Sequence, residues 1–239
     1  MKIYYDFHIH SALSPCGDED MTPNNIVNMA ALKGLNAIAV TDHNSVLNCR
    51  AAIKAAAELD LCVLPGLELC TAEEIHILCL FALPDDAEAF YEEVKNNFMP
   101  IKNKPDIFGR QLIMDENDEV VGEEEILLTM ATRISVNDVP HLVEKYGGVA
   151  IPAHVDRPSY SMTAVFGELP DYLGFGCIEV SQKGDIDDVR KKYPNVISFA
   201  RICNSDAHYL ENISEPENVL EVEKCEPKEI LRAIRKNFI

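Results

Sequence analysis

The chain has 239 residues, of which 47% are hydrophobic, so a single domain covering residues 1–239 has enough apolar side chains for a large core. Its formal net charge of −19 disfavours binding to long nucleic acids and to anionic membranes. No apolar run approaches the ~20 residues that a membrane-spanning helix requires. An anionic substrate therefore requires a local reversal of the electrostatic field, which bound divalent cations supply.

Eight cysteines are spread along the chain without a C-x-x-C pair. Several lie inside apolar, strand-like runs, where a free cysteine behaves as a small hydrophobic side chain. This pattern favours reduced thiols in a cytoplasmic protein over a disulfide framework. The N-terminus also lacks the basic-then-apolar layout of a signal peptide, because Asp6 and two histidines interrupt it. The sequence leaves the oligomeric state open.

Strand-like runs alternate with helical patterns from the start of the chain, which favours an α/β fold with a largely parallel sheet. After a first strand at residues 3–10, a helix is expected to begin at Thr22-Pro23, with Thr22 as its cap and Pro23 at its first position. Gly34 ends this helix. The next expected elements are a strand at 37–40, a helix at 46–59, and strands at 61–69 and 75–83.

The pattern loosens between residues 85 and 147, which we interpret as an inserted helical and hairpin segment over one rim of the domain. It contains expected helices at 87–98, 123–131 and 136–146 and a hairpin with residues 115–118 at its tip. Strands are expected again at 149–154, 177–180, 196–202 and 219–222. An amphipathic helix at 227–237 ends the chain.

Histidines mark the ends of the expected strands. Six of the seven lie in or near such ends: His8, His10, His43, His76, His154 and His208. His8 and His10 alternate along the first strand, so their side chains project from the same face. In parallel α/β barrels the carboxyl ends of the strands gather at one rim, where chemistry is placed. We therefore expect the six imidazoles to converge there, with His141 outside the group.

One carboxylate is expected beside these imidazoles in a hairpin. Glu68 follows Pro65-Gly66-Leu67 at the end of the third strand, and Glu68 and His76 are equally far from Ala72. A hairpin that turns at Ala72 places these two side chains opposite each other, with Cβ atoms ~5 Å apart. A carboxylate in that position is suited to bridge two cations, one of which His76 also binds.

A second carboxylate, Asp206, forms an Asp-x-His pair with His208 and repeats the alternating spacing of the first strand. Neutral imidazole is a common ligand of transition metals, and carboxylates complete such sites. Mixed ligands of these two kinds, without a cysteine cluster, suit Zn, Mn or Fe at a functional site more than a structural zinc site.

These motifs follow one another in an order that resembles the PHP (polymerase and histidinol phosphatase) family. The residues that carry the resemblance are His8-x-His10-Ser11, Thr41-Asp42-His43-Asn44, Pro65-Gly66-x-Glu68, His76, Ala153-His154 and Ser205-Asp206-x-His208. The resemblance implies a distorted (β/α)7 TIM-like barrel with two or three divalent metal ions (Zn, Mn or Fe) at the strand ends. It implies three ligand groups: His8, His10, Glu68 and Asp206; Glu68, His76 and His154; and His43 with His208. The first group would act in catalysis through its bound metal.

The sequence departs from the family pattern in the loop after the first strand. Members of the family usually carry Asp or His five or six residues after the second histidine of the first motif, as a ligand of the third ion. Pro15 and Cys16 occupy those places here. We predict that Asp18 substitutes as the ligand, with Cys16 as the next candidate. The alternative is that the acidic residues of this loop form only a solvated turn.

Clustered divalent cations neutralise a phosphate ester, lower the pKa of bound water and stabilise the entering and leaving oxygens. The chain has no Gly-rich phosphate loop, no G-x-S-x-G elbow and no Cys/His pair suggestive of covalent catalysis. We therefore predict a metal-dependent phosphoesterase that hydrolyses a small-molecule or nucleotide phosphomonoester by metal-activated hydroxide. The alternatives are an exonuclease acting on short nucleic-acid ends and a non-catalytic, regulatory metal-binding domain.

Three residues are candidates for binding the small phosphorylated substrate. Arg157 follows His154 closely, and a guanidinium there can grip phosphate oxygens in a bidentate manner. Arg201 precedes the last motif and is the second candidate. For each arginine the alternative is an ordinary ion pair. Asn44 is predicted either to touch the substrate or orient a ligand, or to cap the following helix.

Overall fold

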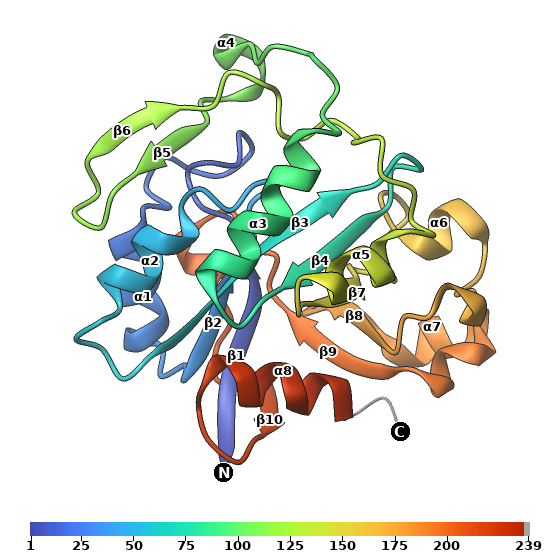
Figure 1. Cartoon of the computed structure of the whole chain (residues 1–239). Helices are drawn as coiled ribbons and strands as arrows, with labels where there is room; N and C mark the ends of the chain where they lie inside the picture. Colours follow the sequence, from blue (N-terminus) through green and yellow to red (C-terminus); the bar gives the residue numbers. More distant parts are fainter. Residues whose placement is uncertain (237–239) are drawn as a thin grey trace.

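The computed structural model describes residues 1–236, and the expected helix end at residue 237 lies outside this range. The fold is mixed α/β, and its largest sheet curls into half a barrel (Figure 1). Its strands, in spatial order, are β10 (Val219–Glu221), β1 (Lys2–Ile9), β2 (Ala37–Val40), β3 (Cys62–Cys70), β4 (His76–Leu80) and β7 (Val149–Pro152).

A parallel pair, β8 (Cys177–Ser181) and β9 (Ala200–Asn204), continues the curl. β8 lies beside the end of β7, where Val155 N donates to Glu179 O at 2.9 Å. β9 lies beside β1, because His10 N donates to Ala207 O at 2.9 Å just beyond both strands. The strand expected at 196–202 is displaced, since Pro194–Ser198 forms a 3-10 turn and the strand begins only at Ala200.

The expectation of a largely parallel sheet holds for β1, β2 and β3 and fails at β4. β4 runs antiparallel to both β3 and β7 because a short turn without a helix joins it to β3. β10 is also antiparallel to its neighbour β1. The alternation of strand and helix expected for a (β/α)7 barrel is therefore interrupted in the middle of the sheet.

The β3–β4 hairpin forms as predicted, but its predicted register is wrong. Cys70 pairs with His76, and Glu68 pairs with Leu78. Glu68 and His76 are thus diagonal neighbours rather than opposite each other. The turn is shifted along the chain because Glu74 adopts the left-handed conformation (φ 60°) that closes it.

Helices cover the outer face of the curled sheet. α1 (Pro23–Leu32) packs on α2 (Cys49–Ala55), α3 (Pro84–Lys95) packs on β3, and α5 (Val139–Lys145) packs on β7. The start of α1 is as predicted, since the Thr22 side chain accepts a hydrogen bond from Asn25 N. Two further helices, α6 (Met162–Phe166) and α7 (Ile186–Lys192), precede and follow β8 in the chain. None of the helices in residues 1–236 is long and apolar enough to span a membrane.

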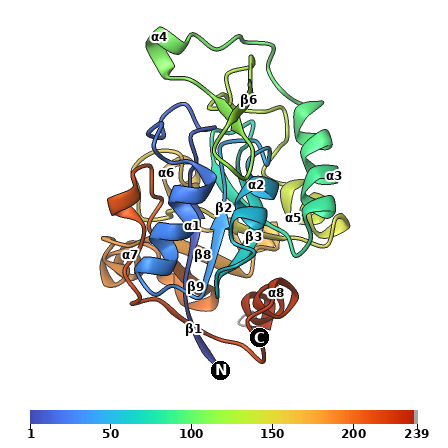
Figure 2. The same cartoon turned by 90° about the vertical axis from the view of Figure 1, so that its left-hand side faces the viewer.

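Between α3 and α5 the chain forms α4 (Pro105–Phe108) and the hairpin of β5 (Leu112–Met114) and β6 (Val120–Glu123). Both views place this segment at the end of the molecule opposite α8 (Pro227–Lys236) (Figures 1 and 2). The predicted hairpin is confirmed. The helix predicted at 123–131 is wrong: the buried Gln111 side chain bonds the backbone of Glu124, Ile126 and Leu128, which holds that segment irregular.

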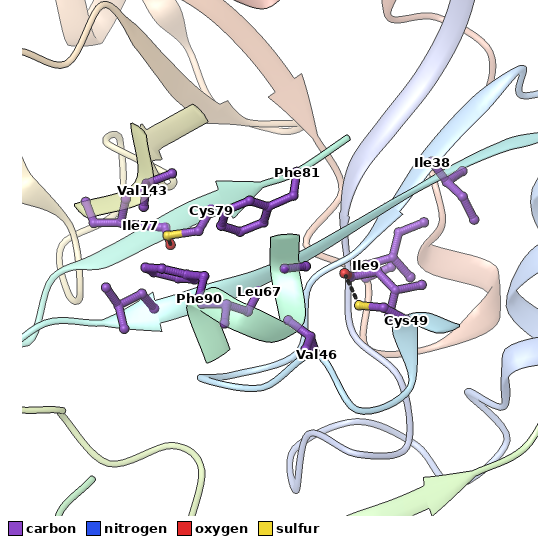
Figure 3. Close-up of a cluster of buried hydrophobic side chains, with 14 of the residues drawn as sticks. Ile9, Ile38, Val46, Cys49, Leu67, Ile77, Cys79, Phe81, Phe90 and Val143 are labelled. Atoms are coloured by element: carbon purple, nitrogen blue, oxygen red, sulfur yellow. Dashed lines mark hydrogen bonds between the residues drawn. The ribbon is translucent and has the colours of Figure 1, made fainter. Parts of the chain in front are cut away.

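Buried side chains form two main cores on the two faces of the sheet. The outer core lies between sheet and helices and includes Ile38, Leu67 and Phe90 (Figure 3). The inner core fills the interior of the curl, with Phe7 and Leu64 at its centre. α8 contributes Ile230, Leu231 and Ile234 to the inner core, so the apolar interior is covered at the end away from the predicted strand-end site.

A β-bulge in β1 determines which face its histidines occupy. Between Asp6 and Ile9 the strand contains one more residue than β2 does between Ile38 and Val40. Tyr5 and Phe7 point into the inner core, whereas Ile9 belongs to the outer core. The extra residue reverses the alternation, and His8 and His10 therefore point into the interior.

Gly66 allows β3 to approach its neighbour β4 closely. A Cβ atom on Gly66 would lie 2.8 Å from the Cys79 carbonyl oxygen and 2.9 Å from Leu80 Cδ2. We predict that Gly66→Ala lowers the free energy of unfolding by about 1–3 kcal/mol, because this backbone contact cannot relax without moving β3. Denaturant unfolding measures the change.

Gly122→Ala is the matched control, since a Cβ on this strand glycine meets only Ile113 Cδ1 at 3.6 Å, an ordinary contact. Its expected effect is within about 1 kcal/mol of zero. Equal effects of the two substitutions would show that the space around Gly66 does not constrain β3.

Candidate metal centre

The six histidines predicted to converge do so, around the carboxylate of Glu68. Glu68 is 1% exposed and lies on the interior face of β3. His43, His76 and His154 each bring a ring nitrogen to within about 3 Å of a Glu68 oxygen, at 2.9, 2.9 and 3.1 Å. His141 is exposed on α5, away from this group.

Four of the predicted ligands form a first group at the end of β1. His8 Nε2 and His10 Nε2 are 3.2 Å apart. The Asp206 Oδ1 atom lies 3.3 Å from the former and 3.0 Å from the latter. Glu68 Oε1 lies 3.3 Å from His8 Nε2. Four donor atoms from three separate segments therefore face one another.

A second group of imidazoles also faces Glu68. Its Oε1 atom is 2.9 Å from His76 Nδ1 and 3.1 Å from His154 Nε2. The diagonal register of the hairpin thus still brings His76 to Glu68. The Glu68 carboxylate therefore borders both groups of histidines.

A third group consists of ring nitrogens of His10, His43 and His208, all within 4.8 Å of one another. Cys16, which extends from the loop after β1, has its thiol beside the imidazoles of His43 and His208. Asp18, the predicted ligand, instead accepts a hydrogen bond from Asp20 N within its own loop. The structure therefore places Cys16 beside the third group.

Charge at the centre is balanced between imidazoles and carboxylates. Burial alone would raise the pKa of Glu68, but His76 and His8 hold it well below its usual value. Burial alone would lower the pKa of His8, but Glu179 and Asp206 raise it well above its usual value. The carboxylates thus attract positive charge strongly into a buried site.

His10 and Cys16 differ from their neighbours. Burial and the nearby His208 and His43 lower the pKa of His10 well below its usual value, which favours the neutral imidazole that binds metals. Partial desolvation would raise the pKa of the Cys16 thiol, but contacts with His208 and His43 lower it to about 6. A thiolate is the form of cysteine that coordinates metals.

Hydrogen bonds to the Nδ1 atoms orient three of the histidines. His8 Nδ1 lies 3.0 Å from Glu179 Oε1, and His10 Nδ1 lies 2.9 Å from Ser14 Oγ. His208 Nδ1 lies 2.9 Å from its neighbour's carbonyl oxygen, Asp206 O. Each contact favours an Nδ1–H tautomer and leaves Nε2 as the atom that can bind an ion.

Two carboxylates outside the predicted ligand set, Glu179 and Asp42, support the centre. Glu179 is fully buried in β8 and accepts hydrogen bonds from His154 N (2.8 Å) and Asn204 Nδ2 (2.7 Å) as well as facing His8. Asp42 accepts from Ser14 Oγ at 2.7 Å, and Ser14 in turn holds His10. The sequence signal for Glu179 is a single carboxylate inside the apolar run at 177–180. A buried charge in a strand needs a partner, so such a residue indicates a contact with another charged or polar group.

Strained backbone aims several of these residues. His154 (φ 31°) and Asp206 (φ 53°) adopt left-handed conformations directly after β7 and β9. Asn44 (φ 50°) does the same after β2. Such conformations cost about 1–3 kcal/mol each and persist where the surroundings enforce them. At His154 and Asp206 they turn the side chains toward the metal centre, whereas the Asn44 side chain turns toward Cys70 and Leu128.

The unpaired atoms of the centre fit metal ions. Among residues 1–236, the buried atoms that make no hydrogen bond include His43 Nδ1, Glu68 Oε2, His154 Nδ1 and Asp206 Oδ1. Buried polar atoms without partners are rare in proteins, and their grouping indicates a site built for cations. The donor set of imidazole and carboxylate suits divalent transition metals.

The three predicted substrate-binding residues lie in different places. Arg157 is half-buried and pairs with Asp206 Oδ2, at the edge of a cavity of about 160 Å³ that the metal-centre residues line. Arg201 is exposed on β9 and is not among the residues lining that cavity. The buried Asn44 amide bonds Leu128 O, Met130 O and Cys70 N, so it ties loops to β3 instead of facing substrate or capping α2.

The curled sheet and the centre define an α/β protein with a histidine- and carboxylate-rich site for metal ions at its strand ends. The family model of the PHP domain matches residues 6–211. The chain therefore belongs to the PHP family, as its motifs predicted. No curated protein matches the chain.

Among solved structures, the chain is similar to the lesion-specific endonuclease PfuEndoQ from Pyrococcus furiosus (21% identity, TM-score 0.74), covering 99% of this chain and 56% of that one. Endonuclease Q in complex with a 27-mer duplex gives 21% identity and a TM-score of 0.72, covering 99% and 57%. A protein from Bifidobacterium adolescentis, proposed to be a metal-dependent phosphoesterase, gives 19% identity and a TM-score of 0.63, covering 98% and 96%. This chain thus spans about half the length of the endonuclease.

Glu179 provides a test of the site's geometry. Its three neighbours are all hydrogen-bond donors, so Glu179→Gln places an amide NH₂ against one of them and releases His8 from its orientation. We predict that the affinity for divalent metal falls about 10–100-fold. Competition with a coloured chelator measures the affinity. Glu168→Gln, at an exposed position, is the control and should bind metal as the unsubstituted protein does.

Proposed function

We propose that this protein is a metal-dependent hydrolase that cleaves a small-molecule or nucleotide phosphomonoester. The observation that carries the proposal is that the buried carboxylate of Glu68 faces two groups of imidazoles. This arrangement suits two adjacent divalent ions. When bound, such ions lower the pKa of water and stabilise charge on the entering and leaving oxygens of a phosphate ester.

The chain's own residues have distinct tasks in this proposal. His8, His10 and Asp206 would hold one ion, His76 and His154 would hold a second, and Glu68 would contribute to both. Arg157 would bind non-bridging oxygens of the phosphate, since its guanidinium lies at the cavity beside Asp206 and is also held by Ser181 Oγ at 3.2 Å.

The dimensions of the site support a monoester. The cavity at the centre has a volume of about 160 Å³, which suits a phosphoryl group rather than a whole nucleotide. Tyr160 closes one side, with its ring stacked on His76 at a centroid distance of 4.7 Å. A second, polar cavity of about 390 Å³ shares Arg157 and Asp206 with the first and offers space for the remainder of a substrate.

Cleavage of a nucleic-acid phosphodiester is the second candidate, favoured by the similarity to endonuclease Q, one of whose structures contains a DNA duplex. This similarity conflicts with the sequence-based expectation that the chain does not bind long nucleic acids, which rested on the net charge of −19. Three cationic side chains line the cavity of about 390 Å³: Arg157, Lys183 and Lys33. Lys33 is already bonded to Ile213 O and Glu215. Duplex binding commonly uses about 6–10 phosphate contacts, which is more than these cationic side chains provide.

A panel of substrates decides between these functions. We expect metal-dependent release of phosphate from p-nitrophenyl phosphate or from metabolite and nucleotide monophosphates. Cleavage of abasic duplex or of oligonucleotide ends, without monoester turnover, would favour the nuclease alternatives. No turnover of any substrate with Zn²⁺, Mn²⁺ or Fe²⁺ supplied would favour a regulatory metal-binding domain.

The first substitution test addresses metal binding. His10→Ala and Asp206→Ala each remove a donor atom from the first group, so we predict loss of activity together with a lower metal content. Elemental analysis and phosphate release are measured on the same preparation. Chelation should abolish the activity of the unsubstituted protein, and added metal should restore it. Full activity in either variant would exclude the proposed centre.

The second substitution test separates the two predicted substrate arginines. Arg157→Ala removes charge-assisted hydrogen bonds worth about 1.5–3 kcal/mol, so we predict that KM rises about tenfold or more while metal content stays unchanged. Arg201→Ala should leave KM unaltered, because Arg201 is exposed on β9. The opposite pattern, with KM sensitive only to Arg201, would contradict the assignment of the phosphate site to Arg157.

A further inference from the structure

The loop after β1 presents Cys16 to the metal centre in a fixed conformation. Gly17 N donates to Ser14 O at 2.8 Å, and a Cβ on Gly17 would lie 2.7 Å from Ser11 O, so the turn is tight. Asp18 N then donates to His208 O at 2.9 Å, which ties the loop to the end of β9. Cys16 is therefore held beside His208 by backbone contacts on its C-terminal side.

The donor atoms around Cys16 come from His43 and His208, both of which contact its thiol. His208 uses Nδ1 on the Asp206 carbonyl, and its Nε2 remains for an ion. His10 is the nearest competitor, but its Nδ1 is bonded to Ser14 and its Nε2 faces His8 and the first group. One thiol and two imidazoles thus share a location beside the Glu68 Oε2 atom, which lies 2.9 Å from His43 Nδ1.

Asp18 does not offer an equivalent donor. Its Oδ1 atom accepts the hydrogen bond from Asp20 N at 2.9 Å, which closes a turn within the loop. Its backbone, not its side chain, makes the contact with His208. The prediction that Asp18 completes the third group therefore gives way to Cys16, which stands at one of the two positions where the family usually carries Asp or His.

We propose that Cys16, His43 and His208 bind a divalent ion through one thiolate sulfur and two imidazole nitrogens, and that this site selects Zn²⁺, Co²⁺ or Fe²⁺ over Mn²⁺ and Mg²⁺. Sulfur and nitrogen ligands favour the softer ions, whereas Mn²⁺ and Mg²⁺ prefer oxygen. Three protein ligands leave a fourth, open position, as in sites that bind water or substrate. The inference rests on the metal centre proposed above and adds the identity of one ligand and the selectivity it confers.

Cobalt substitution tests the ligand without any measurement of turnover. The chelated protein is reconstituted with Co²⁺, and its near-ultraviolet spectrum and bound cobalt are recorded. We expect a sulfur-to-cobalt charge-transfer band that Cys16→Ser abolishes, together with the loss of one ion per chain. Cys16→Asp should retain the ion without the band and should bind Mn²⁺ more tightly relative to Zn²⁺ than the unsubstituted protein does.

Matched controls use Cys203→Ser, which removes a half-buried thiol on β9, and Asp18→Ala, which removes the rejected ligand. Both should keep the band and the full cobalt content. A band that survives in Cys16→Ser, or an ion that is lost in Asp18→Ala, would overturn the proposal. A normal Cys16 result without phosphate release from any substrate would refute the proposed function and leave the ligand assignment intact.

The unsubstituted protein supplies an independent measurement. Cys16 is exposed at the surface, so maleimide should label it in the chelated protein, and Zn²⁺ should protect it. Labelling of Cys203 should be the same with and without Zn²⁺. Peptide mass spectrometry locates the labels. Equal labelling of Cys16 in both states would contradict the proposal, even if Cys16→Ser proved unstable.

Discussion

One buried carboxylate constrains the whole centre. Transfer of an unpaired carboxylate from water to a protein interior costs several kcal/mol, so Glu68 requires positive charge or hydrogen-bond donors on every side. Five histidines with ring nitrogens within 3.5 Å of its oxygens provide them, and they come from β1, β4 and the segments after β2 and β7. Glu68 therefore connects the ends of these strands through its contacts with the histidines. The two hydrophobic cores connect the strands through their faces.

The interior of the curled sheet is divided into an apolar and a polar half. On β1 and β3 the inward side chains are apolar first, as at Tyr5 and Leu64, and ionisable near the ends, as at His10 and Glu68. The bulge in β1 is needed for this division, because an unbroken alternation would direct His8 and His10 toward the helices. Left-handed residues after β7 and β9 serve the same purpose where the strands end.

The sequence predicts the parts of this arrangement that depend on periodicity and on residue type. Strand β2 forms over the residues expected, and six histidines converge because buried strands end beside them. A pattern of period two shows that His8 and His10 share a face, but it does not show which face, because the bulge has no signature in the local sequence. The hairpin register escaped prediction for a similar reason, since the left-handed residue is Glu74 rather than a glycine.

Long-range hydrogen bonds account for the remaining differences. The segment expected to be helical at 123–131 has helical periodicity, but the buried Gln111 side chain competes for its backbone groups. Glu179 is 171 residues from His8 in the chain, so no local pattern connects them. The choice between Asp18 and Cys16 depends on the path of a loop whose turns are closed by its own backbone, and residue type alone does not show that path.

The balance of charge at the centre determines the order in which ligands can bind. Glu68 and Glu179 are buried, the Asp206 side chain is 9% exposed, and Arg157 is the guanidinium that contacts this group. Imidazoles bind metal ions in their neutral form, and in that form the carboxylates outnumber Arg157, so the site is negative, as is the chain as a whole at −19. An anionic substrate that entered such a site would meet repulsion that increases with burial. Divalent cations reverse this field, so the arrangement favours metal binding first and phosphate binding afterwards. Arg157 then orients the phosphate, whose charge the ions have already neutralised.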